Sequence, residues 1–102
     1  MSSLRPAGTC LMIGGEEHRV FFSLGVIDEL QSRFGKTVGQ LLVMLKDPVE
    51  GPGYLREILT ALLNDEGIRL KNGKRYTKEE VGSLVMQKEI PGLTIALLLA
   101  FN

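Results

Sequence analysis

The chain has 102 residues, of which 44% are hydrophobic and 24% are charged, and these values are typical of one small globular domain. Twelve acidic residues balance twelve basic ones, which argues against an overall electrostatic attraction to nucleic acid or to anionic lipid. Cys10 is the only cysteine, so an intrachain disulfide is excluded and a reducing compartment is favoured.

No segment of the chain is typical of secretion or of membrane insertion. The N-terminal residues lack the apolar core of a signal peptide, and we expect residues 1–8 to form a disordered leader before a single domain over residues 9–102. The longest apolar run, Leu93–Phe101, is about half of the roughly 20 residues that cross a bilayer. The sequence therefore predicts a soluble cytoplasmic protein.

The first predicted element is a β-hairpin centred on Gly14-Gly15. Two glycines allow the positive φ angles that a tight two-residue turn requires. The apolar run Cys10–Ile13 precedes this pair, and His18–Phe22 supplies the return strand. Because two strands are only marginally stable alone, we expect helices to pack on this hairpin.

Two short helices are predicted after the hairpin. Ser23 is a good N-cap for the first helix, and Gly35 fits the left-handed position just past its end. The apolar stripe of this helix consists of Leu24, Ile27, Leu30 and Phe34. Thr37 and Gln40 form a capping box that starts the second helix. Its apolar face contains Val38, Leu41, Leu42 and Leu45.

A loop rich in proline and glycine, Asp47–Gly53, separates these helices from a third one. The third helix is predicted from about Tyr54 to Asn64, with Gly67 ending it. Its predicted buried residues are Leu55, Ile58, Leu59, Leu62 and Leu63. In residues 68–76, Asn72-Gly73 lies between alternating residues, which indicates either a second small hairpin or a long exposed loop.

The C-terminal part is predicted to hold two more helices. Thr77 and Glu80 form a capping box for a helix through about Lys88, whose buried residues are Val81, Leu84 and Val85. Pro91 suits the first turn of a last helical segment, Gly92–Phe101. The whole pattern predicts an α+β fold, mainly α, with an N-terminal β-hairpin followed by four to five short helices.

The last segment is apolar on nearly every side, and such a helix has to be surrounded. A domain of this size does not easily enclose a helix on all sides. Three interpretations remain open: a central core helix, a helix buried against another subunit, and a truncated chain. The residues that would join subunits or hold a partner are Leu93, Ile95, Leu97, Leu98, Leu99 and Phe101.

The sequence contains no set of residues typical of a catalytic, cofactor or metal site. His18 is the only histidine, so a zinc site would depend on acidic ligands, and we interpret His18 as a solvent-facing strand residue. Cys10 is interpreted as a small buried hydrophobe, because His18 is the only candidate base for a nucleophilic thiol. We therefore expect a protein that is not an enzyme and needs no cofactor.

One cluster of positive charge lies between residues 69 and 78. Its members are Arg69, Lys71, Lys74, Arg75 and Lys78. A loop with this charge suits phosphate contacts, but flanking acidic residues offset the charge. Those residues are Asp65, Glu66, Glu79 and Glu80. The alternatives are a solvated loop, a site for an acidic protein partner and, less favoured, a nucleic-acid site.

Residues 10–45 join several motifs in one order: an apolar strand, a Gly-Gly-Glu turn, a return strand ending in Val-Phe-Phe, the helix centre Leu-Gly-Val-Ile-Asp-Glu-Leu and the helix end Arg-Phe-Gly-Lys-Thr. This pattern resembles the start of the tail assembly chaperones of long-tailed bacteriophages, and most of all the group named after a gene-transfer-agent tail protein. The helix at Leu55–Leu63 and the helix start at Thr77 are also similar, whereas the Lys71–Arg75 insert departs from the family pattern.

The resemblance implies a non-enzymatic assembly factor of a phage or prophage, working in the cytoplasm of the bacterial host. Such proteins are thought to coat the long helical tape measure protein until tail tube subunits polymerise around it, and they tend to self-associate. The implied partners are the tape measure and tail tube proteins and further copies of the chain, and helix-in-groove packing suits them. The alternatives are a small nucleic-acid-binding or regulatory module that uses the basic 69–78 loop, and a minor structural tail protein.

Overall fold

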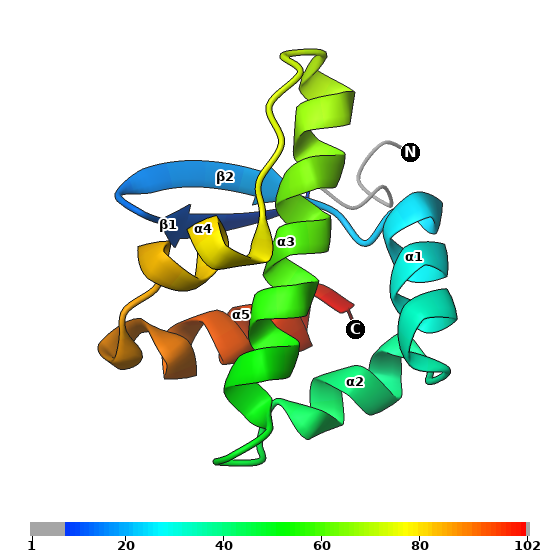
Figure 1. Ribbon diagram of the computed structural model, residues 1–102, viewed down its shortest axis with the longest axis vertical. Coiled ribbons are helices and arrows are strands. Elements are labelled where there is room, and N and C mark those ends of the chain that lie inside the picture. Colours follow the sequence, from blue (N-terminus) through cyan, green and yellow to red (C-terminus); the bar gives the residue numbers. More distant parts are fainter. Residues whose placement is uncertain (1–7, 102) are drawn as a thin grey trace.

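The computed structural model describes residues 8–101, which form a two-stranded hairpin and five α-helices, with the longest helix in the middle (Figure 1). The elements are β1 (Thr9–Ile13), β2 (Glu16–Val20), α1 (Leu24–Phe34), α2 (Val38–Met44), α3 (Gly51–Leu70), α4 (Lys78–Leu84), a single 3-10 turn η2 (Gln87–Glu89) and α5 (Ile90–Phe101). This is the expected α+β, mainly α fold. Apart from Gly8, the predicted disordered leader lies outside the described residues.

The hairpin forms at Gly14-Gly15 as predicted. Both glycines have positive φ angles, 61° and 81°, and Ile13 pairs directly with Glu16 across the two-residue turn. The buried side chains on its inner face are Leu11, Ile13, His18 and Val20. The return strand ends at Val20, two residues earlier than predicted, because the chain then leaves the sheet toward α1.

The capping signals of the first two helices are confirmed. The Ser23 hydroxyl accepts a hydrogen bond from the Val26 N–H, and Gly35 adopts a left-handed φ of 64°. Thr37 and Gln40 exchange the two hydrogen bonds of a capping box. The predicted face of α2 is buried throughout.

The predicted stripe of α1 is wrong at its first residue. Leu24 is 82% exposed, whereas Val26 and Leu30, one helical turn apart, are buried. Residues two apart are separated by about 200° around a helix, so Leu24 and Val26 cannot both face the core. Ile27 and Phe34 lie at the edge of the buried face and pack against the core.

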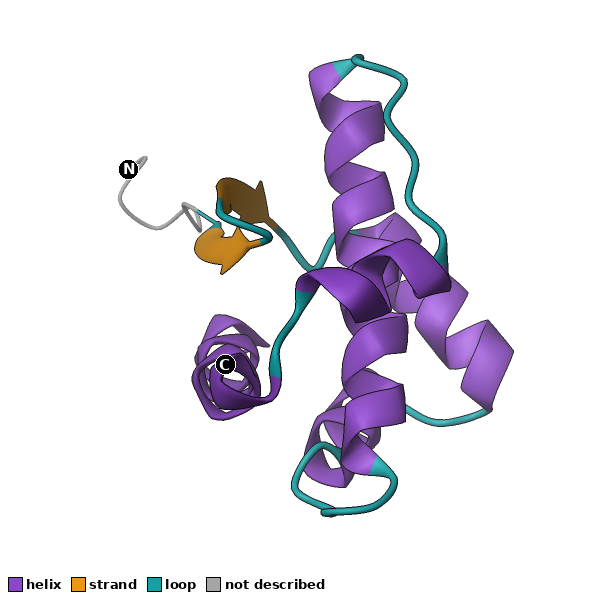
Figure 2. Ribbon diagram, turned by 60° about the vertical axis from the view of Figure 1, so that its left-hand side comes forward, coloured by secondary structure: helices purple, strands orange, loops and turns teal. Residues whose placement is uncertain are grey.

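Helix α3 runs through the middle of the molecule, with the hairpin and α5 on one side and α1 on the other (Figures 1 and 2). All five residues predicted to be buried in this helix are buried. Its bounds differ from the predicted ones at both ends. Pro52 is tolerated in the first turn, where no intrahelical donor is needed, so the helix begins at Gly51.

Gly67 does not end α3, which continues to Leu70 and stops at Lys71 in a left-handed conformation. A Cβ atom at Gly67 would overlap the carbonyl oxygen of Lys74. This glycine therefore allows the segment after α3 to pass close to the helix, a tertiary role that local helix signals do not reveal.

The second hairpin does not form, and residues 71–77 run back along α3 as a loop (Figure 1). Asn64 fixes this loop by pairing with the backbone of Tyr76. Its Oδ1 accepts from the Tyr76 N–H at 2.6 Å, and its Nδ2 donates to the Tyr76 carbonyl at 3.1 Å. Since α3 supplies the partner that a second strand would have supplied, the loop alternative is the one observed.

Helix α4 starts with the predicted Thr77–Glu80 capping box but ends at Leu84, four residues before the predicted end. Val85 is extended, and the chain bends by 87° between α4 and the segment from Gln87 to Phe101. Val81 is buried as predicted, whereas Leu84 and Val85 are only partly buried. This bend places α5 beside β1 and directs its C-terminal end toward α2 (Figure 1).

The same bend also determines whether the apolar C-terminal part could form one membrane-spanning helix. Within residues 8–101, no single helix is both long and apolar enough to cross a bilayer. Helix α4 and the segment from Gln87 to Phe101 reach the required length and hydropathy only together, as a bent pair.

Candidate interaction surface

Helix α5 is half core and half surface. It contains no charged side chain, and Thr94 is its only polar one. Leu93 and Leu97 are buried in the hydrophobic core, and Leu98 packs against that core. The large hydrophobic residues of α5 that remain exposed are Ile95 at 57%, Leu99 at 69% and Phe101 at 39%, and together we term them the exposed α5 face.

The six predicted interface residues thus divide between two roles. The inner three serve the domain's own core, as the interpretation of a core helix expects. The outer three are only partly covered by the described part of the chain, so they are the part of α5 that a second subunit or a partner would have to cover. The rim of this face is fixed, because the Phe101 ring meets the edge of the Phe22 ring at 5.4 Å between centroids.

The basic cluster is not a set of five free cations. Arg69 forms an ion pair with Asp65 at 2.6 Å and lies over the Phe21 ring, 4.4 Å from its centroid. Lys78 forms an ion pair with Glu57 at 3.1 Å.

Lys74 lies 5.4 Å from the centroid of the Tyr76 ring. Hydrogen bonding to the Tyr76 side chain is the main cause that raises the pKa of Lys74 above its ordinary value. Among the described residues, only Lys71 and Arg75 of the cluster lack such a partner, so the surface offered to a phosphate backbone is smaller than the sequence indicates.

The prediction of a solvent-facing His18 is wrong. His18 is buried, and its Nδ1 lies 2.6 Å from Oε1 of Glu66, whose other oxygen accepts from the Arg19 N–H at 3.0 Å. These contacts tie β2 to the C-terminal half of α3. The sequence did contain a signal for the burial of His18. His18 and Val20 are two residues apart and so share one face of the strand, and the apolar Val20 indicates that this face is the one turned toward the core.

We term His18, Asn64, Glu66 and Tyr76 the polar joint, since they connect the hairpin, α3 and the loop after it. Among the described residues, no buried side-chain nitrogen or oxygen lacks a hydrogen-bond partner. The joint is therefore satisfied internally, which indicates a structural role.

The prediction of a buried Cys10 is also wrong, because Cys10 is exposed on the outer face of β1. A hydrogen bond with Glu17 raises the pKa of the Cys10 thiol, which lowers the fraction of reactive thiolate. Leu11 pairs with His18 on the inner face, whereas Cys10 pairs with Arg19 on the outer face. The thiol and the imidazole thus lie on opposite faces of the hairpin, and the described residues contain no cluster of three or more metal-ligating side chains.

Comparisons with protein-family models, with curated proteins and with solved structures found no match for this chain.

Proposed function

We propose that this chain is a non-enzymatic phage tail assembly chaperone that covers apolar helical surface, either on the tape measure protein or on its own copies. The observation that carries the proposal is the exposed α5 face, where a helix without charge leaves Ile95 and Leu99 largely uncovered. Uncovered apolar patches are typical of interaction sites. The resemblance of residues 10–45 supplies the phage setting, the tail tube protein as a further partner and the host cytoplasm as the place of action.

The physical driving force is the burial of these side chains. Fully burying one leucine or isoleucine contributes about 1.5–3 kcal/mol. Ile95 and Leu99 are four residues apart and so lie one above the other on a single side of the helix. This arrangement suits packing against one apolar stripe of another helix.

Co-expression with a long helical tape measure protein tests the proposal. The unchanged chain is expected to keep that protein in the soluble fraction and to be recovered with it in a pull-down. The double variant I95Q/L99Q is expected to lose both effects. The matched control is L24Q, which removes a leucine that is 82% exposed on α1 and should leave both effects intact.

Size-exclusion chromatography distinguishes whether the chain covers its own copies or the tape measure protein. If copies cover each other, the elution volume depends on concentration for the unchanged chain and not for I95Q/L99Q. A strictly monomeric chain that also fails to solubilise the tape measure protein would contradict the proposal.

A further inference from the structure

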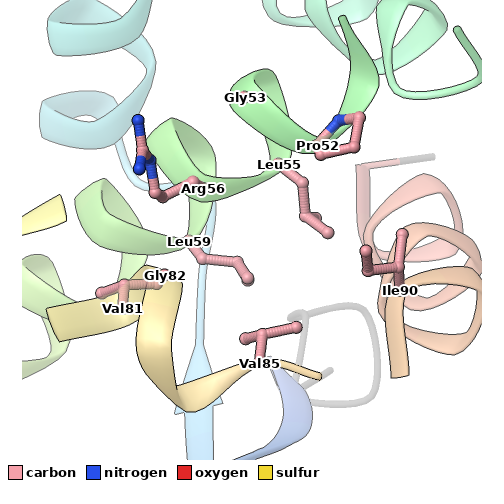
Figure 3. A pocket seen from close by; sticks show the side chains of 9 residues that line it. All are labelled: Pro52, Gly53, Leu55, Arg56, Leu59, Val81, Gly82, Val85 and Ile90. Carbon is pink, nitrogen blue, oxygen red and sulfur yellow. The ribbon is translucent and has the colours of Figure 1, made fainter. Parts of the chain in front are cut away.

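A groove separate from the exposed α5 face lies between the first half of α3, α4 and the start of α5. Its volume is about 340 Å³. The floor consists of buried side chains, Leu55, Leu59 and Val81, and the walls include Val85 and Ile90 (Figure 3). Figure 3 shows the side chains of Leu55, Leu59, Val85 and Ile90 directed into one shared space. The groove is thus open to solvent but lined by aliphatic surface.

Among the described lining residues, Arg56 is the only charged one, and it lies at the edge of this groove. Its side chain runs over Gly82, where a Cβ atom would lie 3.1 Å from the Arg56 Cδ. Arg56 is exposed, and within residues 8–101 it makes no ion pair, in contrast to Arg33 and Arg69. None of the described lining residues is acidic. The groove therefore combines an apolar floor with one positive charge that forms no ion pair within residues 8–101.

We propose that this groove binds an amphipathic helix of a protein partner, with aliphatic side chains over Leu55 and Val85 and an aspartate or glutamate facing Arg56. The positive charge selects the acidic residue, since a guanidinium pairs well with a carboxylate. The lining comes mainly from helices and contains no strand, so no sheet edge is offered to an extended peptide. A partner helix satisfies its own backbone groups and needs only side-chain contacts.

The inference rests on the proposed function in one respect, that the partner is a helical protein. It differs in its residues, since none of Ile95, Leu99 and Phe101 lines the groove. The two surfaces can therefore be tested separately, and each can fail without the other.

The probes are two fluorescein-labelled, alanine-rich helical peptides with leucines at positions i, i+4 and i+7. One carries glutamates one turn from the central leucine, and the other carries glutamines at the same positions. Fluorescence anisotropy at low salt is expected to show that the glutamate peptide binds about two- to fivefold more tightly, as for an exposed ion pair. High salt is expected to remove this difference.

Three variants locate the binding. R56Q is expected to bind both peptides equally, at the affinity that the unchanged chain has for the glutamine peptide. V85D, which places a carboxylate in the groove wall, is expected to bind neither, with circular dichroism confirming that it is folded. I95Q/L99Q is expected to bind both peptides as the unchanged chain does, even if it abolishes the proposed chaperone function.

Methyl NMR spectra of the unchanged chain provide a readout that needs no variant. Addition of the glutamate peptide is expected to shift the signals of Leu55, Val81, Val85 and Ile90. Equal affinities for the two peptides, an unchanged preference in R56Q, or shifts confined to Ile95 and Leu99 would each overturn the inference. Displacement of the peptide by octanoate at similar concentration would assign the groove to a small carboxylate and would also overturn it.

Discussion

The polar joint and the exposed α5 face reverse the usual distribution of side chains. In the joint, a histidine and a glutamate are buried and satisfy each other at 2.6 Å. On α5, isoleucine and leucine are more than half exposed. Buried polar groups are costly when they lose a partner, whereas exposed apolar groups contribute little to the stability of the free chain. The comparison therefore predicts that stability depends on the joint and that association depends on α5.

The largest expected effect comes from closing the space beside Gly67, next to the joint. In G67V, the new side chain meets the Lys74 carbonyl, so the loop after α3 has to move away and carry Tyr76 with it. We expect a loss of about 3 kcal/mol in the free energy of unfolding, measured by urea denaturation. The control is G53A on the same helix, where a Cβ meets no atom within 4 Å and the change should stay within about 0.5 kcal/mol.

Equal effects of G67V and G53A would contradict the tertiary role given to Gly67. They would mean that the loop after α3 does not need to lie against the helix.

The second effect tests the joint directly. In E66A, His18 Nδ1 and the Arg19 N–H both lose their partner. A loss of about 2 kcal/mol in the free energy of unfolding is expected, because buried groups become unsatisfied. The exposed Glu79 supplies the control, since E79A should cost no more than about 0.5 kcal/mol.

A double-mutant cycle with H18A sharpens this measurement. If His18 and Glu66 act as a pair, the cost of E66A falls in the H18A background. Strict additivity of the two substitutions would show that the contact does not contribute to stability.

The sequence predicted what depends on neighbouring residues. The glycine turn, the Ser23 cap and the two capping boxes at Thr37 and Thr77 are all present, because a few consecutive residues determine each of them. The α+β fold class followed from their order.

The errors arose where distant residues decide the outcome. Gly67 was interpreted as a helix end because only the folded chain brings Lys74 next to it. His18 was interpreted as exposed because its buried partner, Glu66, lies 48 positions away in the sequence. The groove beside Arg56 was missed for the same reason, since its floor is assembled from α3 and α4. The split of α5 into inner and outer sides could not be read from a segment that is apolar all round.

Substitutions in the exposed α5 face are expected to affect stability less than those in the polar joint. The double variant I95Q/L99Q should change the free energy of unfolding by no more than about 0.5 kcal/mol per site, since both side chains are already exposed. Measured beside E66A, it separates stability from association. A large destabilisation would mean that the exposed α5 face serves the domain's own fold.

The smallest effect concerns Asp47. This residue is exposed, like the outer residues of α5, but in contrast to them it is expected to stabilise the fold. Its Oδ1 accepts hydrogen bonds from the N–H groups of Glu50 and Val49, in that order of importance, and they lower the pKa of Asp47 below 3.8. A carboxylate with a lowered pKa contributes stability above pH 3.8, and this contribution is lost as the pH falls through the folded-state value. The melting temperature of D47N is therefore expected to be lower than that of the unchanged chain at neutral pH, and the two should converge in acid. A difference that stays constant across this range would show that the charge of Asp47 does not stabilise the turn before α3.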